Sequence, residues 1–239
     1  MVWDTNWEQM TIAWVNQQLI EADSVHGLHH IRRVFVNVLQ IAAIEKANMD
    51  IVVPAAWLHD CILIAKDSPL RADASHLAAQ LATEFLESIN YPSHCIAAIA
   101  HCIHAHSFSA GIPCETLEAC VVQDADRLEA LGAIGLARCL MTGGAIRQRL
   151  YDPNDPFPHN RSPDDRKQVV DHFFVKLLTL ADTMKTPTGH KLAKQRTDFL
   201  IGFLHQLSKE IGAEPNSLHL ALKRIHRAPV NDPATFDMP

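Results

Sequence analysis

Glycine and aromatic residues are both scarce in this chain. Glycine occurs 9 times in 239 residues, and Phe, Trp and Tyr together make up 6%. Aromatic side chains are enriched in strands, so their scarcity weighs against a sheet protein. Alanine and leucine are abundant instead, and no segment shows the period-two alternation of a half-buried strand. The composition therefore predicts an all-α fold.

Positive charge is also in short supply. The chain has 21 Lys and Arg against 27 Asp and Glu, a net charge of −6. Broad contact with a nucleic-acid backbone requires a basic face, so we expect no nucleic-acid partner. A small anionic substrate stays compatible with this balance, because a bound metal ion brings its own positive charge.

Motifs for targeting, membrane insertion and nucleotide loops are missing as well. The first residues lack the basic and apolar segments of a signal peptide, and the chain has no GxGxxG or Walker-type loop. Residues 91–114 carry no Asp, Glu, Lys or Arg, and such a stretch is long enough to span a membrane. Its four histidines favour a buried helix lined with site residues instead. We expect a cytoplasmic protein with no membrane partner.

The six cysteines show no CxxC spacing and stand in apolar, helical contexts. This favours buried, reduced thiols over disulfides or a cysteine metal site.

Apolar residues at helical spacing organise most of the chain. We expect one domain over residues 1–227 and a mobile tail over 228–239, where the periodicity ends. Residues 141–165 are rich in Gly and Pro, so this long irregular segment is predicted to border the active site as a lid. The expected helices cover about 7–20, 29–47, 50–59, 73–89, 92–106, 115–137, 166–184, 189–211 and 215–227.

His59 and Asp60 close an apolar helix that begins at Ile51. A histidine and an aspartate side by side are costly in a core unless something pairs with them, and a divalent metal ion would do so. His30 upstream and Asp126 downstream offer two more ligands of the right kind.

Three short motifs carry a resemblance to a known family. They are His30-Ile-Arg-Arg-Val, Ala56-Trp-Leu-His59-Asp60 and Ala125-Asp126-Arg-Leu. Their order and spacing resemble the HD superfamily of metal-dependent phosphohydrolases, and residues 123–138 and 180–193 are similar to a bacterial subfamily of small HD hydrolases. The resemblance implies a single-domain helical bundle with one divalent ion held by His30, His59, Asp60 and Asp126. That subfamily commonly has Gly-Arg where this chain has Gly189-His190, which leaves the role of that arginine without a counterpart.

Nitrogen and carboxylate ligands suit Mn, Fe, Mg, Co, Ni or Zn. Such an ion lowers the pKa of water and offsets charge on phosphoryl oxygens. One ion per chain is favoured. His76 and His101 occupy places where two-metal relatives carry extra ligands, so two ions are the alternative.

Asp124 and Asp126 compete for the last ligand position. Side chains two residues apart on a helix do not face the same way, so one of them should reach the metal. The family pattern favours Asp126. Asp124 is then expected to orient a histidine or water, as is His26, one helical turn before His30.

The remaining site residues are assigned from position and chemistry. His76 is predicted to act with Asp60 in catalysis, protonating a leaving group. Lys66, Arg33 and His101 are predicted to bind phosphate; for Lys66 and Arg33 a plain surface charge is the alternative.

The leading prediction is a phosphohydrolase acting on a nucleotide or another small phosphate ester or anhydride. One alternative is a di-iron HD-type oxygenase of a small organic substrate. Another is a non-enzymatic HD module that senses a nucleotide.

Overall fold

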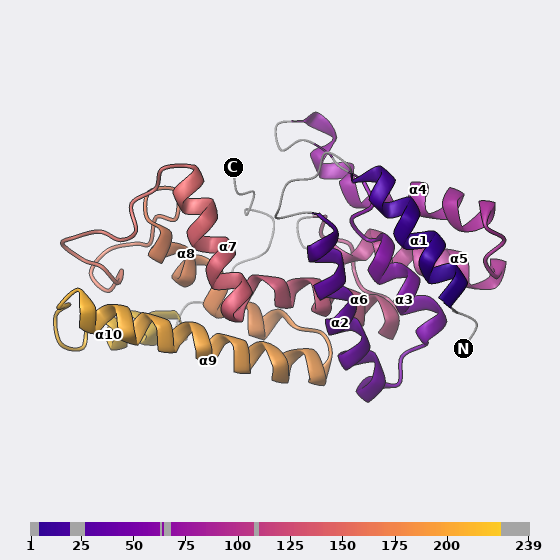
Figure 1. Cartoon of the computed structure of the whole chain (residues 1–239). Helices are drawn as coiled ribbons and strands as arrows, with labels where there is room; N and C mark the ends of the chain where they lie inside the picture. The colour runs from indigo at the N-terminus through magenta and orange to yellow at the C-terminus, as the bar shows by residue number, and fades with distance from the viewer. Residues whose placement is uncertain (1–4, 20–26, 63, 65–67, 108–109, 226–239) are drawn as a thin grey trace. The chain divides into compact units, whose positions relative to one another are not determined.

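Helices are the regular secondary structure of the described part of the chain. The computed structural model describes residues 5–19, 27–62, 64, 68–107 and 110–225 (Figure 1). In these ranges no strand forms, and the one extended pairing is an isolated parallel bridge between Arg149 and Gln168. The structure thus confirms the all-α prediction.

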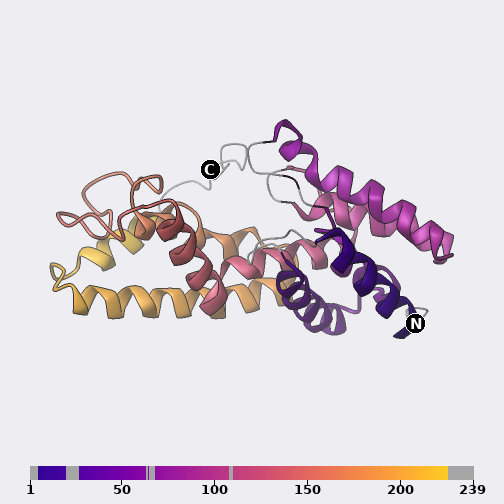
Figure 2. The same ribbon diagram turned by 45° about the horizontal axis from the view of Figure 1, so that its top comes forward.

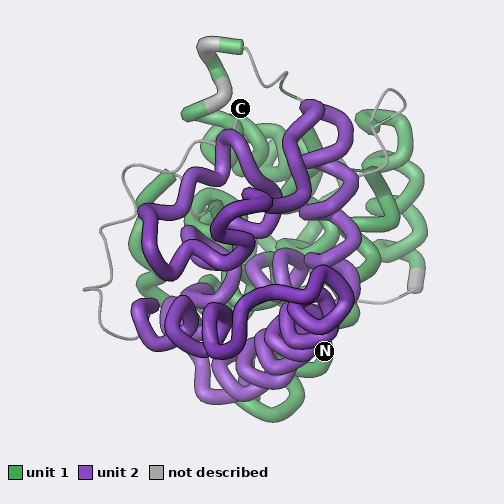
Figure 3. The backbone as a smooth tube through the Cα atoms, turned by 90° about the vertical axis from the view of Figure 1, so that its left-hand side faces the viewer, with its two compact units in different colours: residues 1–126, 232–239 green, residues 127–231 purple. Residues whose placement is uncertain are grey.

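The described residues divide into two compact units, one ending at Asp126 and the other beginning at Arg127 (Figure 3). The boundary falls in the last turn of α6, inside the single domain expected over 1–227. The domain limits stay a prediction, and the tail 228–239 lies outside the described residues. The first unit holds α1 (Thr5–Gln18), α2 (Leu28–Glu45), α3 (Met49–Leu58), the 3-10 helix η1 (Pro69–Asp73), α4 (Ala74–Ser88), α5 (Ser93–His106) and most of α6 (Leu117–Arg127).

Helix α3 is the centre of the first unit. It packs against α1, α2, α4 and α5, while α4 and α5 run side by side (Figure 2). Every residue from Val52 to Leu58 is buried, as its apolar sequence predicts. Pro54 lies in the second turn and cannot donate to the carbonyl of Asp50. The Tyr91 hydroxyl donates to that carbonyl at 2.6 Å, so the Asp50 carbonyl has a hydrogen-bond donor in place of the missing N–H.

The second unit is built around the long helix α9. Helix α7 and the 3-10 segments η2 and η3 pack on α9, and α10 packs on α8 and α9. Thr186 caps α9 by accepting a hydrogen bond from the Gly189 N–H at 2.9 Å. The elements of this unit are η2 (Leu128–Ala130), α7 (Gly132–Ala145), α8 (Val169–Val175), η3 (Leu177–Thr183), α9 (Pro187–Glu210) and α10 (Ser217–Ile225).

Two expected long helices are broken, so those predictions were wrong. The helix expected over 115–137 changes to 3-10 geometry after Arg127 and breaks at Leu131, because Leu131 is extended and Gly132 has a φ of +67° that favours glycine. Gly135 follows where a Cβ atom would lie 2.2 Å from the backbone of Ala130, so α7 can begin close to η2. The helix expected over 166–184 turns into 3-10 geometry after Val175.

The irregular segment covers residues 146–168, since α7 continues to Ala145. Arg161 donates to both carboxylate oxygens of the fully buried Asp171. Arg224 of α10 donates to the carbonyls of Pro158, His159 and Arg161 at 2.7 to 3.0 Å. The segment is therefore tied to its own unit by two arginines. Its role as a lid stays a prediction.

All six cysteines are free thiols. Cys61, Cys95 and Cys102 are buried, as expected, whereas Cys114, Cys120 and Cys139 are partly exposed. Within the described ranges, no helix combines the length and apolar character needed to cross a bilayer.

Candidate metal centre

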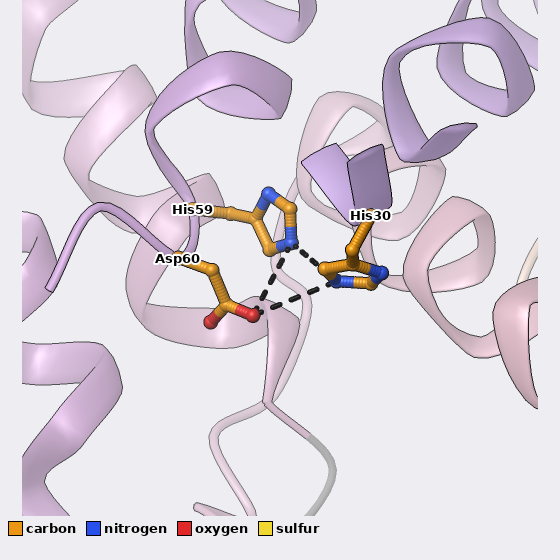
Figure 4. A group of neighbouring side chains, drawn as sticks. All are labelled: His30, His59 and Asp60. Atoms are coloured by element: carbon orange, nitrogen blue, oxygen red, sulfur yellow. Dashed lines mark hydrogen bonds and ion pairs between the residues drawn. The ribbon is translucent and has the colours of Figure 1, made fainter. Parts of the chain in front are cut away.

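Two histidines and an aspartate converge at one point of the first unit. The Nε2 atoms of His30 and His59 lie 3.3 Å apart, and Asp60 Oδ2 lies 3.5 Å from the first and 3.8 Å from the second. Figure 4 shows the three side chains pointing toward one another. Among the described residues, they form the group of His, Cys, Asp and Glu donors close enough to share an ion, with all three donor atoms within 4.8 Å.

Asp126 joins this group from α6. Its Oδ1 lies 3.3 Å from His30 Nε2 and 3.9 Å from His59 Nε2. Asp124, two residues earlier on the same helix, is completely buried. Because side chains two positions apart point in different directions, this geometry favours Asp126 over Asp124 as the direct ligand.

The four side chains stand at or near helix ends. His30 is the third residue of α2, and His59 caps the C-terminal end of α3 with Asp60 directly after it. Asp126 is the penultimate residue of α6. The apolar faces of these helices fix their packing, and that packing brings the polar ends together.

The tautomer of His59 is set by its backbone. Its Nδ1 lies 2.9 Å from the carbonyl of Ala56, which can only accept, so Nδ1 carries the hydrogen. The lone pair of neutral His59 is therefore on Nε2, facing His30 and Asp60. A backbone carbonyl commonly orients metal-binding histidines in this way.

The protonation states suit a cation. Burial lowers the pKa of His59, although Asp60 opposes the shift, and this favours the neutral ring. Burial alone would raise the pKa of Asp60, but the neighbouring rings of His59, His106 and His30 hold it well below its usual range. The pKa of Asp126 is also lowered, against burial, mainly by His30. Neutral imidazoles and ionised carboxylates are the forms that bind divalent metals.

His106, which is not among the predicted site residues, also lies next to this cluster. It is the last residue of α5 and is buried, with Nε2 3.6 Å from Asp60 Oδ1. Its Nδ1 lies 2.6 Å from the carbonyl of Ile103, so Nδ1 must donate. An attractive contact with Asp60 therefore needs a second proton on Nε2. Burial opposes that proton, but the carboxylates of Asp60 and Asp126 and the Ile103 carbonyl together outweigh burial and raise the pKa of His106.

His76 and His101 lie outside the group of shared donors. His76 is exposed on α4, where Gln80 Nε2 lies 3.0 Å from its Nε2 and the ring of His104 lies 5.2 Å away. His101 is partly buried on α5, and its Nε2 accepts a hydrogen bond from the Glu115 N–H at 3.2 Å. The catalytic role of His76 and the phosphate contact of His101 stay predictions.

Of the other predicted site residues, Arg33 is partly exposed, three residues after His30 on α2. His26 and Lys66 lie outside the described residues. The roles assigned to all three stay predictions.

Comparisons with known proteins identify the family of this chain. A protein-family model described as the HD domain matches residues 27–131, the range that holds His30, His59, Asp60 and Asp126. YpgQ of Bacillus subtilis, itself described as uncharacterized, is 35% identical over an alignment of 203 residues that covers 83% of this chain and 90% of YpgQ. The chain therefore belongs to the HD superfamily, whose domains bind divalent metal ions.

Solved structures extend the likeness across both units. An HD-superfamily hydrolase from Bacillus thuringiensis has a TM-score of 0.69 and 31% identity, covering 88% of this chain and 100% of that one. The structure of B. subtilis YpgQ in complex with ADP has a TM-score of 0.64 and 33% identity, covering 85% of this chain and 97% of YpgQ. The chain shares the fold of HD-superfamily hydrolases.

Proposed function

We propose that this protein is a divalent-metal-dependent phosphohydrolase that cleaves a nucleotide or another small phosphate compound. The observation that carries the proposal is the convergence of His30, His59, Asp60 and Asp126, with pKa shifts of His59, Asp60 and Asp126 that favour a neutral ring and ionised carboxylates. An ion bound there would polarise phosphoryl oxygens and lower the pKa of a water molecule that attacks phosphorus.

The negative charges of the site residues make phosphate binding depend on a bound cation. Asp60 and Asp126 are both ionised, and their side chains are 34% and 27% exposed. Two partly exposed carboxylates repel a phosphate group unless a cation offsets their charge. Substrate should therefore bind weakly to metal-free protein.

A nucleotide is the substrate class with the best support. The relative YpgQ, 33% identical over most of both chains, was solved in complex with ADP. One ion per chain is proposed, because the described donors that lie close enough to share an ion form one group.

Other residues complete the proposal. His76 donates a proton to the leaving group, and its exposed position on α4 leaves it accessible to a substrate. Arg33, Lys66 and His101 contact phosphate, while Asp124 and His26 orient the ligands.

The experiment is a product-resolved hydrolysis screen. Chelated protein is reloaded with Mn, Mg, Co, Ni, Fe or Zn and incubated with nucleoside mono-, di- and triphosphates. Ion chromatography then separates phosphate, pyrophosphate and triphosphate, which identifies the bond that is cut. Asp126→Asn is the inactive control, and His94→Ala, an exposed histidine on α5, is the control for unspecific effects.

Each outcome points to one function. Metal-dependent turnover that Asp126→Asn abolishes supports the proposal. Nucleotide binding without turnover for every metal would indicate the sensing module. About two iron ions per chain with oxygen consumption and no phosphate release would indicate the oxygenase.

A further inference from the structure

Two buried amide side chains hold the helix ends that carry the metal centre. We propose that Asn37 and Gln123 are positioning residues: Asn37 fixes the turn that carries Asp126, and Gln123 fixes the turn that carries His106. This inference rests on the proposed function, because it assigns these residues to the same site.

Asn37 joins α2 to α6. Its side chain is 4% exposed, and its Nδ2 donates to the carbonyl of Ala125 at 3.1 Å. Ala125 directly precedes Asp126 in the last turn of α6, where the helix gives way to the tighter η2. Carbonyls in a last turn lack the regular intrahelical partner, so a side-chain donor from another helix fixes their direction. Asn37 also lies on the same helix as His30, two turns further on.

Gln123 joins α6 to α5 in the same manner. It is 3% exposed, and its Nε2 donates to the carbonyl of Ala105 at 2.6 Å. Ala105 directly precedes His106, the last residue of α5, and Ser107 is extended. The Ala105 carbonyl therefore lies beyond the regular helical ladder. His106 in turn contacts Asp60, so Gln123 acts on the metal centre through His106.

The two amides form one chain of contacts. Asn37 connects α2 with α6, and Gln123 connects α6 with α5. Each bonds to the backbone next to a cluster residue rather than to the ligand itself. Loss of the Asn37 donor frees the turn that carries Asp126, and loss of the Gln123 donor frees the turn that carries His106. All four proposed ligands are still present in both variants, so the expected effect is on metal affinity and ligand geometry.

The test uses variants that remove the donor but keep the volume, Asn37→Leu and Gln123→Met. The matched control is Gln148→Met, because Gln148 Nε2 donates to the carbonyl of Asp165 at 2.6 Å in the other unit. Calorimetry measures binding of Mn²⁺ and Co²⁺ to chelated full-length protein. The visible spectrum of the Co²⁺-loaded protein reports ligand geometry, and thermal unfolding reports stability.

We expect Asn37→Leu and Gln123→Met to bind both ions about 10-fold to 100-fold more weakly and to alter the Co²⁺ spectrum. Gln148→Met should lower the melting temperature and leave the metal affinity and the Co²⁺ spectrum unchanged. Wild-type affinity and spectrum in folded Asn37→Leu and Gln123→Met would overturn the proposal and leave these amides a structural role. If either variant does not fold, Asn37→Ala and Gln123→Ala remove the donor without adding bulk or charge, and the same criteria apply.

The metal readouts separate this inference from the proposed function. Weaker metal binding in the variants, together with a wild-type protein that hydrolyses no phosphate compound, would support the positioning role and refute the hydrolase. Hydrolysis by the wild type, with unchanged metal affinity in the variants, would do the reverse.

Discussion

His30 and His59 present their Nε2 atoms to each other at 3.3 Å, from the start of one helix and the end of another. Two imidazole nitrogens this close repel each other unless a proton or a cation lies between them. Because Nδ1 of His59 already donates to Ala56, the free lone pair on Nε2 is available to that cation.

Removal of a central ligand should empty the site without unfolding the protein. Asp60→Asn keeps the shape of the side chain but removes its charge, and His59→Ala removes a ring nitrogen. Bound metal, measured by mass spectrometry after reloading, should fall to well under half of wild type, while circular dichroism stays helical. His94→Ala should keep wild-type metal. Unchanged metal content in both Asp60→Asn and His59→Ala would rule out the proposed centre.

Substitution of Asp126 and substitution of Asp124 should have different effects on metal binding and turnover. Asp126→Asn should abolish metal binding and turnover, because Asp126 Oδ1 faces both histidines. Asp124→Asn should keep measurable metal and reduce turnover by about 10-fold to 100-fold. The two are compared by calorimetry and by initial rates. Metal retained in Asp126→Asn and lost in Asp124→Asn would reverse the assignment.

His76 should matter to turnover and not to metal binding. If it protonates the leaving group, His76→Ala should keep full metal and lose about 10²-fold to 10⁴-fold in rate. The deficit should shrink with a nitrophenyl phosphate, whose leaving group needs no proton. A fall from about two ions to one would instead make His76 a ligand of a second metal. No change in metal or rate would leave it a surface histidine.

Arg224 should control the mobility of the irregular segment. Its guanidinium donates to three carbonyls of that segment, so Arg224→Ala should speed amide exchange over residues 155–164. Lys223→Ala, the exposed neighbour, is the control and should leave exchange unchanged. Exchange measured with a non-hydrolysable nucleotide also tests the lid: protection around the metal centre without protection over 146–168 would make the segment a plain surface loop.

His172 should make the second unit less stable in mild acid. Burial lowers its pKa, although the hydrogen bond to Asp165 at 2.9 Å opposes the shift. The folded state therefore binds this proton less readily than the unfolded state, whose histidine has a pKa near 6.5. The contribution of neutral His172 to the free energy of unfolding is therefore fully present above about pH 6.5, and it declines as the pH falls below that value. His172→Asn, which keeps a donor for Asp165, should show a smaller fall in melting temperature between pH 7.5 and 5.5; an equal fall would remove His172 as the cause.

The sequence predicted the helical class and most helix positions in the first unit, because apolar periodicity there coincides with burial. It did not predict the break after Arg127, which depends on the φ of Gly132, or the change to 3-10 geometry after Val175. No glycine or proline marks the second break, so the local sequence carries no signal for it.

The ligand candidates His30, His59, Asp60 and Asp126 were found by motif order, and the structure brings all four together. Of the histidines of α5, His101 is among the predicted site residues and His106 is not, although the Nε2 of His106 lies 3.6 Å from Asp60. These histidines are five residues apart on α5 and point to different sides of the helix. Which side faces Asp60 depends on how α5 packs against α3, and the sequence does not show that packing. Their chemical roles stay predictions.

The placement of the ligands at helix ends has a consequence for how this protein opens. Terminal turns fray at a free-energy cost far below that of global unfolding. The ends of α3, α5 and α6 can thus separate while the apolar interior stays closed. A cation that bridges these helix ends would hold them together. We therefore expect the metal-free protein to keep its fold while the ends of α3, α5 and α6 open and close locally.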